Sequence, residues 1–447
     1  MISEDTIVAI ATAHGVGSIS IVRLSGENSL NIALQISKQL TLTPRVATLS
    51  KLYDTKDELI DEAILLYFKN PSSFTGEDIV EFQSHGGVAI SNLILESCIN
   101  LGARIANAGE FSKRAFLNGK IDLTQAQAIS KMIEAKSEDA VKLLARQLKG
   151  ELKEFVEDIR KDLLFMLAYT EVNIDYAEED LPSDIYEQIQ TKLDAIEIKL
   201  TNTLEASKRR EGLIDGFKVA IIGKPNVGKS SLLNKLLNFN RAIVSDIAGT
   251  TRDTIEESVK IGTHIIKIVD TAGIREANDE IEKIGIEKSI EAIEESDIIV
   301  GLFDESREFD EEDRQIIELL EDSNKEKVVI LNKSDLESKF DISKLKENSF
   351  LKLNTKKDIT PLLNKIENIL NQNISGDEVT LISKQQILEV EQTISHIKKA
   401  NMPLETGELE FFAYHINEAL QNISNITRPY EHSAMLDVMF GEFCLGK

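Results

Sequence analysis

The segment "FKVAIIGKPNVGKSS" joins an apolar run to glycines, a lysine and hydroxyl residues at fixed spacing. Its core, Gly223-x4-Gly228-Lys229-Ser230, precedes the helix-forming stretch "SLLNKLL". After a strand, such glycines let backbone N–H groups wrap phosphate oxygens, while the lysine reaches the β- and γ-phosphates and the serine ligates Mg²⁺. The pattern predicts a nucleotide-binding P-loop, with contacts from Asn226, Val227, Gly228, Lys229, Ser230 and Ser231.

A second strand, "IVDTAG", ends in an Asp-x-x-Gly pattern formed by Asp270, Thr271, Ala272 and Gly273. In P-loop enzymes this pattern brings the aspartate near Mg²⁺ and the glycine near the γ-phosphate. Ras-like enzymes orient the attacking water with a glutamine at the next position, which is Ile274 here.

A group that orients the attacking water must therefore come from elsewhere. The following "REANDEIEKIGIEKS" supplies carboxylates among which spacing does not choose, and most of them would be solvated surface charges: Glu276, Asp279, Glu280 and Glu282.

A third strand, "VVILNKSD", ends in Asn332, Lys333, Ser334 and Asp335. A carboxylate at Asp335 can accept hydrogen bonds from N1–H and the 2-amino group of guanine, a pair that adenine lacks. The amide of Asn332 can bridge neighbouring loops, and the stem of Lys333 can cover the base. The three patterns together predict a GTPase that binds GTP.

The composition limits the cellular setting. The chain has 447 residues, enough for two to four domains, and a net charge of −25, which argues against nucleic-acid binding over its whole surface. The acidic start does not fit a signal peptide, and we expect no membrane segment. The two cysteines, Cys98 and Cys444, fit a reducing cytoplasm.

The periodicity indicates four segments and a multidomain α/β fold. Residues 1–118 predict an α+β domain whose strands are interrupted by one helical stretch, "AISNLILESCINLGARIA". Residues 119–215 predict a helical part, with one apolar stripe from Val141 to Met166 on a long helix and a hinge at "EGLIDG". Residues 216–375 predict a mostly parallel sheet, and residues 376–447 a second helical part, so that the GTPase unit is inserted in one helical domain.

Further stretches carry a family resemblance: "SFTGEDIVEFQSHGG", "GEFSKRAFLNGKIDL", "NIDYAEEDLP", "SDIAGTTRD" and the terminal "FCLGK". With them, essentially the whole chain resembles the MnmE (TrmE) family of bacterial tRNA-modification GTPases. The resemblance implies a homodimer whose N-terminal domain binds a one-carbon tetrahydrofolate of the 5-formyl or methylene type. It also implies a Ras-like GTPase unit and an FAD-dependent partner, MnmG, in a heterotetramer-type complex. That complex installs a (carboxymethyl)aminomethyl group on C5 of the wobble uridine, U34, of tRNA.

The resemblance implies folate contacts at Arg23, Glu81, Lys120 and Lys447, with the C-terminal tail folded against the N-terminal domain. Two interpretations of the Cys444 thiol stay open. We favour inert packing, the usual state of a buried free cysteine, and keep a role in handling the one-carbon unit as the alternative.

In the GTPase unit the resemblance implies Mg²⁺ on Ser230 and Thr251 and selects Glu282 as the catalytic residue orienting the water. It implies K⁺ where two GTPase units meet, and it extends the nucleotide contacts. The K⁺ ligands are the Asn226 side chain and backbone oxygens near Ser245, Ile247 and Thr250; the switch contacts are Ser245, Asp246, Ile247, Ala248, Gly249, Thr250 and Thr251. The sequence departs from the family at "LNTKK", where Asn354, Thr355 and Lys356 replace the frequent Ser-Ala-Lys, and at "ISKQQ", where an arginine is frequent.

The rival hypothesis is a regulatory ribosome-assembly GTPase of the Era kind, which shares the "GTTRD" segment. That kind would carry an RNA-binding segment with a Gly-x-x-Gly loop after the GTPase unit. No such loop occurs after residue 375, and that kind does not explain "GEFSKRAFLNGK".

Overall fold

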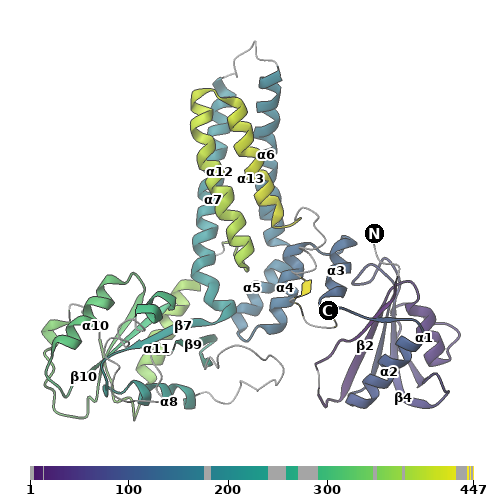
Figure 1. Cartoon of the computed structure of the whole chain (residues 1–447), viewed down its shortest axis with the longest axis horizontal. Helices are drawn as coiled ribbons and strands as arrows, with labels where there is room; N and C mark the ends of the chain where they lie inside the picture. The colour runs from purple at the N-terminus through teal and green to yellow at the C-terminus, as the bar shows by residue number, and fades with distance from the viewer. Residues whose placement is uncertain are drawn as a thin grey trace. The chain divides into compact units, whose positions relative to one another are not determined.

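The computed structural model describes residues 5–13, 15–175, 183–239, 258–269, 290–345, 350–374, 378–428, 440–441, 443 and 446 (Figure 1). The chain divides into two compact units. One comprises Met1–Ile133, Gln147–Gln190 and Ser395–Lys447, and the other Glu134–Arg146 and Thr191–Ile394. Among the described helices, none is both long and apolar enough to cross a membrane.

The N-terminal region forms a six-stranded sheet of order β3-β4-β5-β2-β1-β6, antiparallel except for the β1–β6 pair. Its strands are β1 (Ile7–Ile10), β2 (Ile19–Ser25), β3 (Thr48–Tyr53), β4 (Leu59–Phe68), β5 (Ile79–His85) and β6 (Arg104–Ile105). The strands alternate buried and exposed side chains, as in a sheet that is covered on one face. The covered face packs on helices α1 (Ser29–Ser37) and α2 (Val88–Asn100).

The expectation of one helix in this region is wrong, because α1 and α3 (Glu110–Leu117) form as well as α2. In α1, Ile32, Ala33 and Ile36 share the buried face. Helix α3 is secured by tertiary ion pairs. The buried guanidinium of Arg114 binds Asp5 at 2.7 Å and Glu77 at 3.2 Å. Partners so distant in the sequence leave no local signal.

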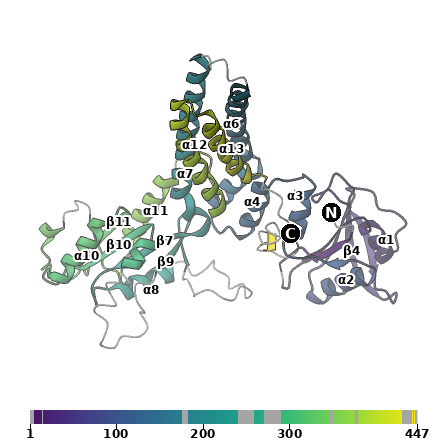
Figure 2. The same ribbon diagram turned by 45° about the horizontal axis from the view of Figure 1, so that its top comes forward.

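The helical part contains α4 (Leu123–Glu134), α5 (Glu138–Leu148), α6 (Glu151–Asp175), α7 (Ser183–Asp215), α12 (Lys384–Thr406) and α13 (Leu409–Asn425). Helices α6 and α13, which belong to the same unit, lie side by side (Figures 1 and 2). The predicted long helix is two helices, because the chain adopts a left-handed conformation at Gly150, with φ of 92°, between α5 and α6. An apolar stripe at helical spacing does not show a break of two residues, Lys149 and Gly150, that preserves its period.

Of the stretch "EGLIDG", predicted as a hinge, all residues but the last are helical. Helix α7 continues to Asp215, and only Gly216, with φ of 91°, ends it before β7 (Phe217–Ile222). Gly212 serves packing, since a Cβ there would lie 2.2 Å from the Phe217 ring.

The GTPase sheet has the order β12-β11-β10-β7-β9-β8, parallel except for the antiparallel β8–β9 pair, which confirms the predicted α/β unit. Its other strands are β8 (Ser258–Ile261), β9 (His264–Val269), β10 (Ile298–Asp304), β11 (Glu326–Asn332) and β12 (Phe350–Lys352). The remaining elements are α8 (Lys229–Phe239), α10 (Glu311–Asp322), the 3₁₀ helix η1 (Ile342–Lys344) and α11 (Thr360–Ile374).

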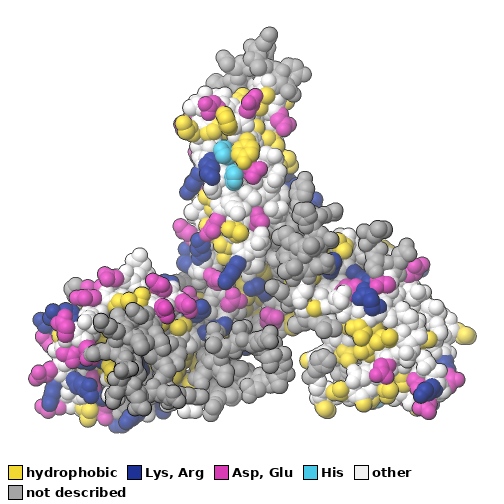
Figure 3. Space-filling model, viewed as in Figure 1, with side chains coloured by type: hydrophobic (Ala, Val, Ile, Leu, Met, Phe, Trp, Pro, Cys, Tyr) yellow, Lys and Arg dark blue, Asp and Glu magenta, His cyan; other side chains and the backbone are white. Residues whose placement is uncertain are grey.

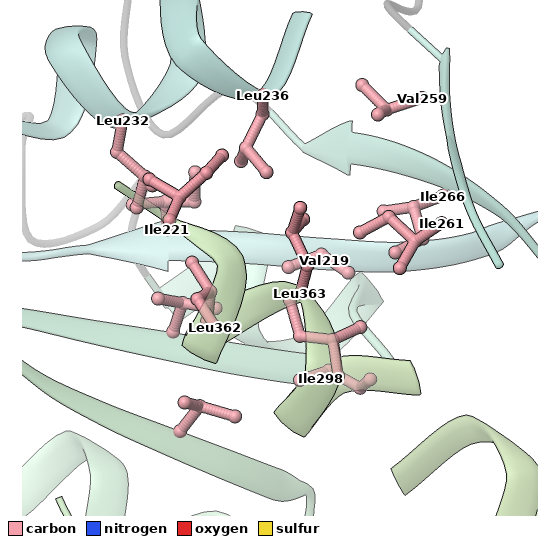
Figure 4. Packing of buried hydrophobic residues seen from close by; sticks show 14 of the residues in the cluster. Val219, Ile221, Leu232, Leu236, Val259, Ile261, Ile266, Ile298, Leu362 and Leu363 are labelled. Atoms are coloured by element: carbon pink, nitrogen blue, oxygen red, sulfur yellow. The ribbon is translucent and has the colours of Figure 1, made fainter. Parts of the chain in front are cut away.

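Both faces of this sheet are covered, as near-continuous apolar strands require. On one face, Leu232 and Leu236 of α8 and Leu363 of α11 pack with strand residues such as Val219 and Ile298 (Figure 4). On the other, Leu320 of α10 joins residues of β10 and β11. Because β7, β10, β11 and β12 run parallel, their carboxyl ends lie along one edge of the sheet, where ligands bind in such folds.

Candidate active site

The P-loop leads from the carboxyl end of β7 into α8. Two of its glycines allow close backbone packing. A Cβ at Gly223 would lie 2.4 Å from the carbonyl oxygen of Leu302, and one at Gly228 would lie 2.2 Å from Nδ2 of Asn332. Only glycine fits either position without a shift of its neighbours, so the loop can follow a phosphate group closely. Backbone N–H groups at the start of a helix favour anions.

The polar P-loop residues lie where the sequence analysis places them. The Lys229 ammonium donates to the carbonyl oxygens of Gly223 and Lys224, and burial lowers the pKa of Lys229. Ser230 is exposed in the first turn of α8, and Ser231 is half-buried. The exposed Asn226 adopts a left-handed backbone, with φ of 65°.

Sequence reasoning missed Lys224, the first variable residue of the P-loop. Its buried ammonium donates to Asp310 at 2.6 Å and to Asp313 at 2.7 Å. Burial opposes its charge, but the two carboxylates raise the pKa of Lys224 above its ordinary value. Asp310 caps α10 and forms a capping box with Asp313. Lys224 thus connects the P-loop to the start of α10. In the sequence, the one indication of this contact is the helix-capping pattern of "DEED" (Asp310 to Asp313).

The amide of Asn332, at the end of β11, connects three loops. Its Nδ2 donates to the carbonyl oxygen of Val227 at 2.7 Å, and its Oδ1 accepts from the backbone N–H of Thr355 at 3.0 Å. Asn332 and Thr355 are buried, whereas Asp335 is exposed at the same edge of the sheet. A buried amide with both ends bonded holds three loops in one arrangement. They are the P-loop and the two predicted base-recognition segments, Asn332 to Asp335 and Asn354 to Lys356.

The other residues of the base-recognition segments lie on the same edge. The Ser334 N–H donates to the carbonyl oxygen of Leu353 at 3.2 Å. Asn354 is half-buried and its Oδ1 accepts from the N–H of the exposed Lys356 at 3.0 Å. Lys333 has φ of 62° and donates from its ammonium to the carbonyl oxygen of Asn226 at 3.0 Å.

Several predicted residues lie outside the described part of the chain. They are Ser245, Asp246, Ile247, Ala248, Gly249, Thr250, Thr251, Asp270, Thr271, Ala272, Gly273, Glu282, Cys444 and Lys447.

A cavity of about 410 Å³ lies in the N-terminal region. Its lining comprises Arg23, Phe68, Phe74, Ile79, Glu81 and Ile129. Arg23 and Glu81 are register partners on β2 and β5, and the guanidinium Nε donates to Oε1 of Glu81 at 2.9 Å. Lys120 is exposed outside this lining, and its stem would lie 3.0 Å from a Cβ at Gly76. The structure therefore brings two of the predicted folate residues together and puts a third near the loop that carries Phe74.

The described residues of the C-terminal tail lie against the N-terminal region, as expected. Phe440 is buried, with its ring 6.1 Å from that of Phe116 and 5.1 Å from that of Phe443. A Cβ at Gly446 would lie 2.5 Å from the carbonyl oxygen of Ile10. Gly446 also has a left-handed φ of 92°, so both the close backbone contact and the backbone conformation favour glycine at this position.

The parallel sheet, the P-loop and the loops joined by Asn332 define the class of P-loop GTPases. Over the whole chain, the profile described as "GTP-binding protein TrmE N-terminus" matches residues 6–120, and that described as "MnmE helical domain" matches residues 123–444. The chain belongs to the MnmE family.

Full-length relatives agree with this assignment. The tRNA modification GTPase MnmE of Aliarcobacter butzleri (strain RM4018) is 68% identical over 448 residues, covering 100% of both chains. That of Sulfurimonas denitrificans is 60% identical over 447 residues, again covering 100% of both. That of Campylobacter jejuni is 52% identical, covering 99% of this chain and 100% of the relative.

Among solved structures, Era of Aquifex aeolicus bound to GDP and AlF₄⁻ is 26% identical, with a TM-score of 0.27. The match covers 40% of this chain and 66% of that one. The FeoB G-domain of Methanococcus jannaschii is 22% identical, with a TM-score of 0.25, over 35% of this chain and 97% of that one.

Proposed function

We propose that the protein is the GTP-hydrolysing subunit of a cytoplasmic complex that modifies C5 of U34 in tRNA, using a one-carbon tetrahydrofolate. One observation carries the proposal: a guanine-type P-loop site and a cavity containing the Arg23–Glu81 pair occur in one chain that matches MnmE relatives along its length. We assign folate binding and dimerisation to residues 1–118, the helical domain to 119–215 and 376–447, and GTP hydrolysis to 216–375.

The P-loop residues fit a magnesium nucleotide. The glycine positions leave room for phosphate, Lys229 is half-buried against the loop, and Ser230 is exposed at the start of α8. Ser230 and Thr251 would hold Mg²⁺, which when bound neutralises charge on the phosphates. Glu282 orients the attacking water in this proposal, since position 274 is an isoleucine.

A monovalent cation is the second proposed ion. The exposed Asn226 side chain, on a loop whose left-handed backbone turns it outward from the buried Val227, suits a K⁺ ligand between two GTPase units. Backbone oxygens near Ser245, Ile247 and Thr250 complete the proposed set. A cation beside the phosphates supplies charge stabilisation in place of an arginine finger.

The cavity in the N-terminal region fits a folate. Phe68, Phe74 and Ile79 offer apolar walls for a pterin and aryl group, and a volume of about 410 Å³ lies in the range of small-molecule sites. The carboxylate of Glu81 can accept from pterin donors. The cations of Arg23, Lys120 and Lys447 suit the carboxylates of the folate tail.

A homodimer through the N-terminal sheet explains its uncovered face. Ile19, Leu49 and Ile64 are exposed there, and Leu49 and Ile64 are register partners on β3 and β4. Large apolar side chains on the open face of a sheet suit an interface with a second copy.

The α12–α13 hairpin offers a surface for the flavin-dependent partner, MnmG. Met402, Phe411 and Tyr414 are exposed on it, and the rings of His396 and His415 lie 5.5 Å apart. In Figure 3, histidine side chains (cyan) and hydrophobic side chains (yellow) lie next to one another on the face shown. Acidic and basic side chains alternate over the described part of this view, so we place the tRNA contacts in a confined region of the assembled complex.

The decisive experiment is the analysis of tRNA from a strain that lacks this protein. We expect U34 to be unmodified at C5 and the modification to return when the wild-type gene is restored, but not with a Lys229→Ala gene. Normal U34 modification in the deletion strain would refute the proposed role.

A further inference from the structure

Two consecutive carboxylates, Asp304 and Glu305, end β10 at the edge of the sheet that carries the nucleotide loops. Their residues are 1% and 3% exposed, which is rare for acidic side chains. They belong to none of the three nucleotide motifs of the sequence. Their burial therefore requires partners. These are Lys333 of the "NKSD" motif and Lys352 at the end of β12, and the exposed Arg307 of the same loop also lies 3.4 Å from Asp304.

Asp304 holds the lysine of the "NKSD" motif. Its Oδ2 accepts from the Lys333 ammonium at 2.5 Å, and its Oδ1 accepts from the hydroxyl of Ser306 at 2.6 Å. The same ammonium donates to the carbonyl oxygen of Asn226 in the P-loop. The ammonium end of the Lys333 side chain is thus held between β10 and the P-loop, so its alkyl stem follows one course along the site.

Glu305 holds a second lysine, which lies next to the last predicted base-recognition segment. Its Oε1 accepts from the ammonium of Lys352, at the end of β12, two residues before Asn354. Its backbone N–H also donates to the carbonyl oxygen of Asn332 at 3.0 Å. Lys352 is half-exposed, so this ion pair is partly screened, whereas the Asp304 carboxylate is fully buried.

We propose that Asp304 and Glu305 are positioning residues for guanine, each acting through a lysine that borders a base-recognition segment. A lysine side chain left free would lose its rotamer freedom when the base binds, and fixing it beforehand removes that cost from binding. The inference rests on the proposed guanine-nucleotide binding, which the wild-type protein tests separately.

The experiment uses the full-length chain and a fluorescent N-methylanthraniloyl GDP. We expect Asp304→Asn to raise the Kd of this GDP about tenfold, mainly through faster dissociation. Glu305→Gln should raise it about threefold, because its partner is half-exposed. The KM for GTP should rise in parallel, while kcat at saturation stays within about threefold. Glu308→Gln is the matched control, since it removes one exposed negative charge on the same loop.

A double variant tests whether Asp304 acts through Lys333: Asp304→Asn is added to a protein that already carries Lys333→Met. This variant keeps most of the stem and removes the ammonium, so adding Asp304→Asn to it should change the Kd less than twofold. A full additional tenfold loss would overturn the proposal, as would an unchanged dissociation rate in a folded Asp304→Asn protein. If Asp304→Asn does not fold, the Kd of Lys333→Met decides, because an unaltered value would overturn the role of the ion pair. Failure of the wild-type protein to bind GDP would instead refute the proposed function.

Discussion

Asp139 of α5 accepts a hydrogen bond of 2.7 Å from the hydroxyl of Thr263, in the turn between β8 and β9. Strand β8 begins five residues after the predicted switch segment "SDIAGTTRD", and β9 ends immediately before Asp270. Leu143 of the same helix packs against the core of the GTPase sheet. Helix α5 therefore contacts the strand pair that joins both predicted switches.

Removing this hydrogen bond should loosen the turn between β8 and β9. A net contribution of about 1 kcal/mol corresponds to about fivefold faster hydrogen exchange of the turn in Thr263→Val or Asp139→Ala. Lys142→Gln is the control, because it removes only the exposed ion pair of Asp139 and should have little effect. Equal exchange in all four proteins would show that the bond adds no local stability.

The same bond carries a pH dependence. Burial would raise the pKa of Asp139, but the hydrogen bond from Thr263 and the charge of Lys142 lower it below its ordinary value. A depressed folded pKa gives stability that is present above the unfolded pKa of about 3.9 and is lost as pH falls through the folded value. The difference in exchange between wild type and Asp139→Asn should therefore be full near neutral pH and disappear in acid. A difference that grows on acidification would contradict this sign.

Guanine specificity should depend on Asp335. In Asp335→Asn the carboxylate that accepts from two guanine donors becomes an amide, so GTP affinity should fall about 100-fold or more. Affinity for xanthosine triphosphate should rise, because its 2-oxo group accepts from the new amide. Titration of both proteins with GTP and with xanthosine triphosphate measures this change of specificity. Unaltered GTP binding in the variant would remove Asp335 from the site.

GTP hydrolysis should depend on K⁺ and on Glu282. Replacing K⁺ with Na⁺ should slow turnover while nucleotide binding persists, because the cation acts on charge that develops in the transition state. Glu282→Ala should reduce kcat about 10²- to 10⁴-fold, as for the loss of a group that orients the attacking water. Steady-state rates in both salts, with binding measured in parallel, test this. Equal rates in both salts and in both proteins would point to another mechanism.

The tail should matter for folate and not for GTP. Deleting residues 444–447 removes Gly446 from its contact with Ile10 and removes Lys447, so folate binding and U34 modification should be lost. GTP hydrolysis should remain. Calorimetric titration with 5-formyltetrahydrofolate and analysis of U34 measure the two outcomes, and normal modification by the truncated protein would exclude the role.

Cys444→Ser separates the two interpretations of the thiol. Full modification activity supports packing, whereas loss of modification with folate binding intact supports chemistry at the thiol.

The sequence by itself determined the parts of the protein whose signal is local. The P-loop, "VVILNKSD" and the apolar strands that precede them each combine residue type with short spacing. Such patterns persist wherever the backbone conformation is dictated by near neighbours. The periodic apolar residues of α13, including Phe412, Ile416 and Ile423, were predicted for the same reason.

Only the tertiary structure decided the remaining features, because they depend on partners far apart in the chain. Helix α3 is held by Arg114 with Asp5, and Phe217 packs closely over Gly212 near the end of α7. Lys224, Asp304 and Glu305 looked like ordinary surface charges until folding buried them. A buried charge needs an opposite charge within hydrogen-bonding distance, and which residue meets that need is settled only when the strands and loops come together.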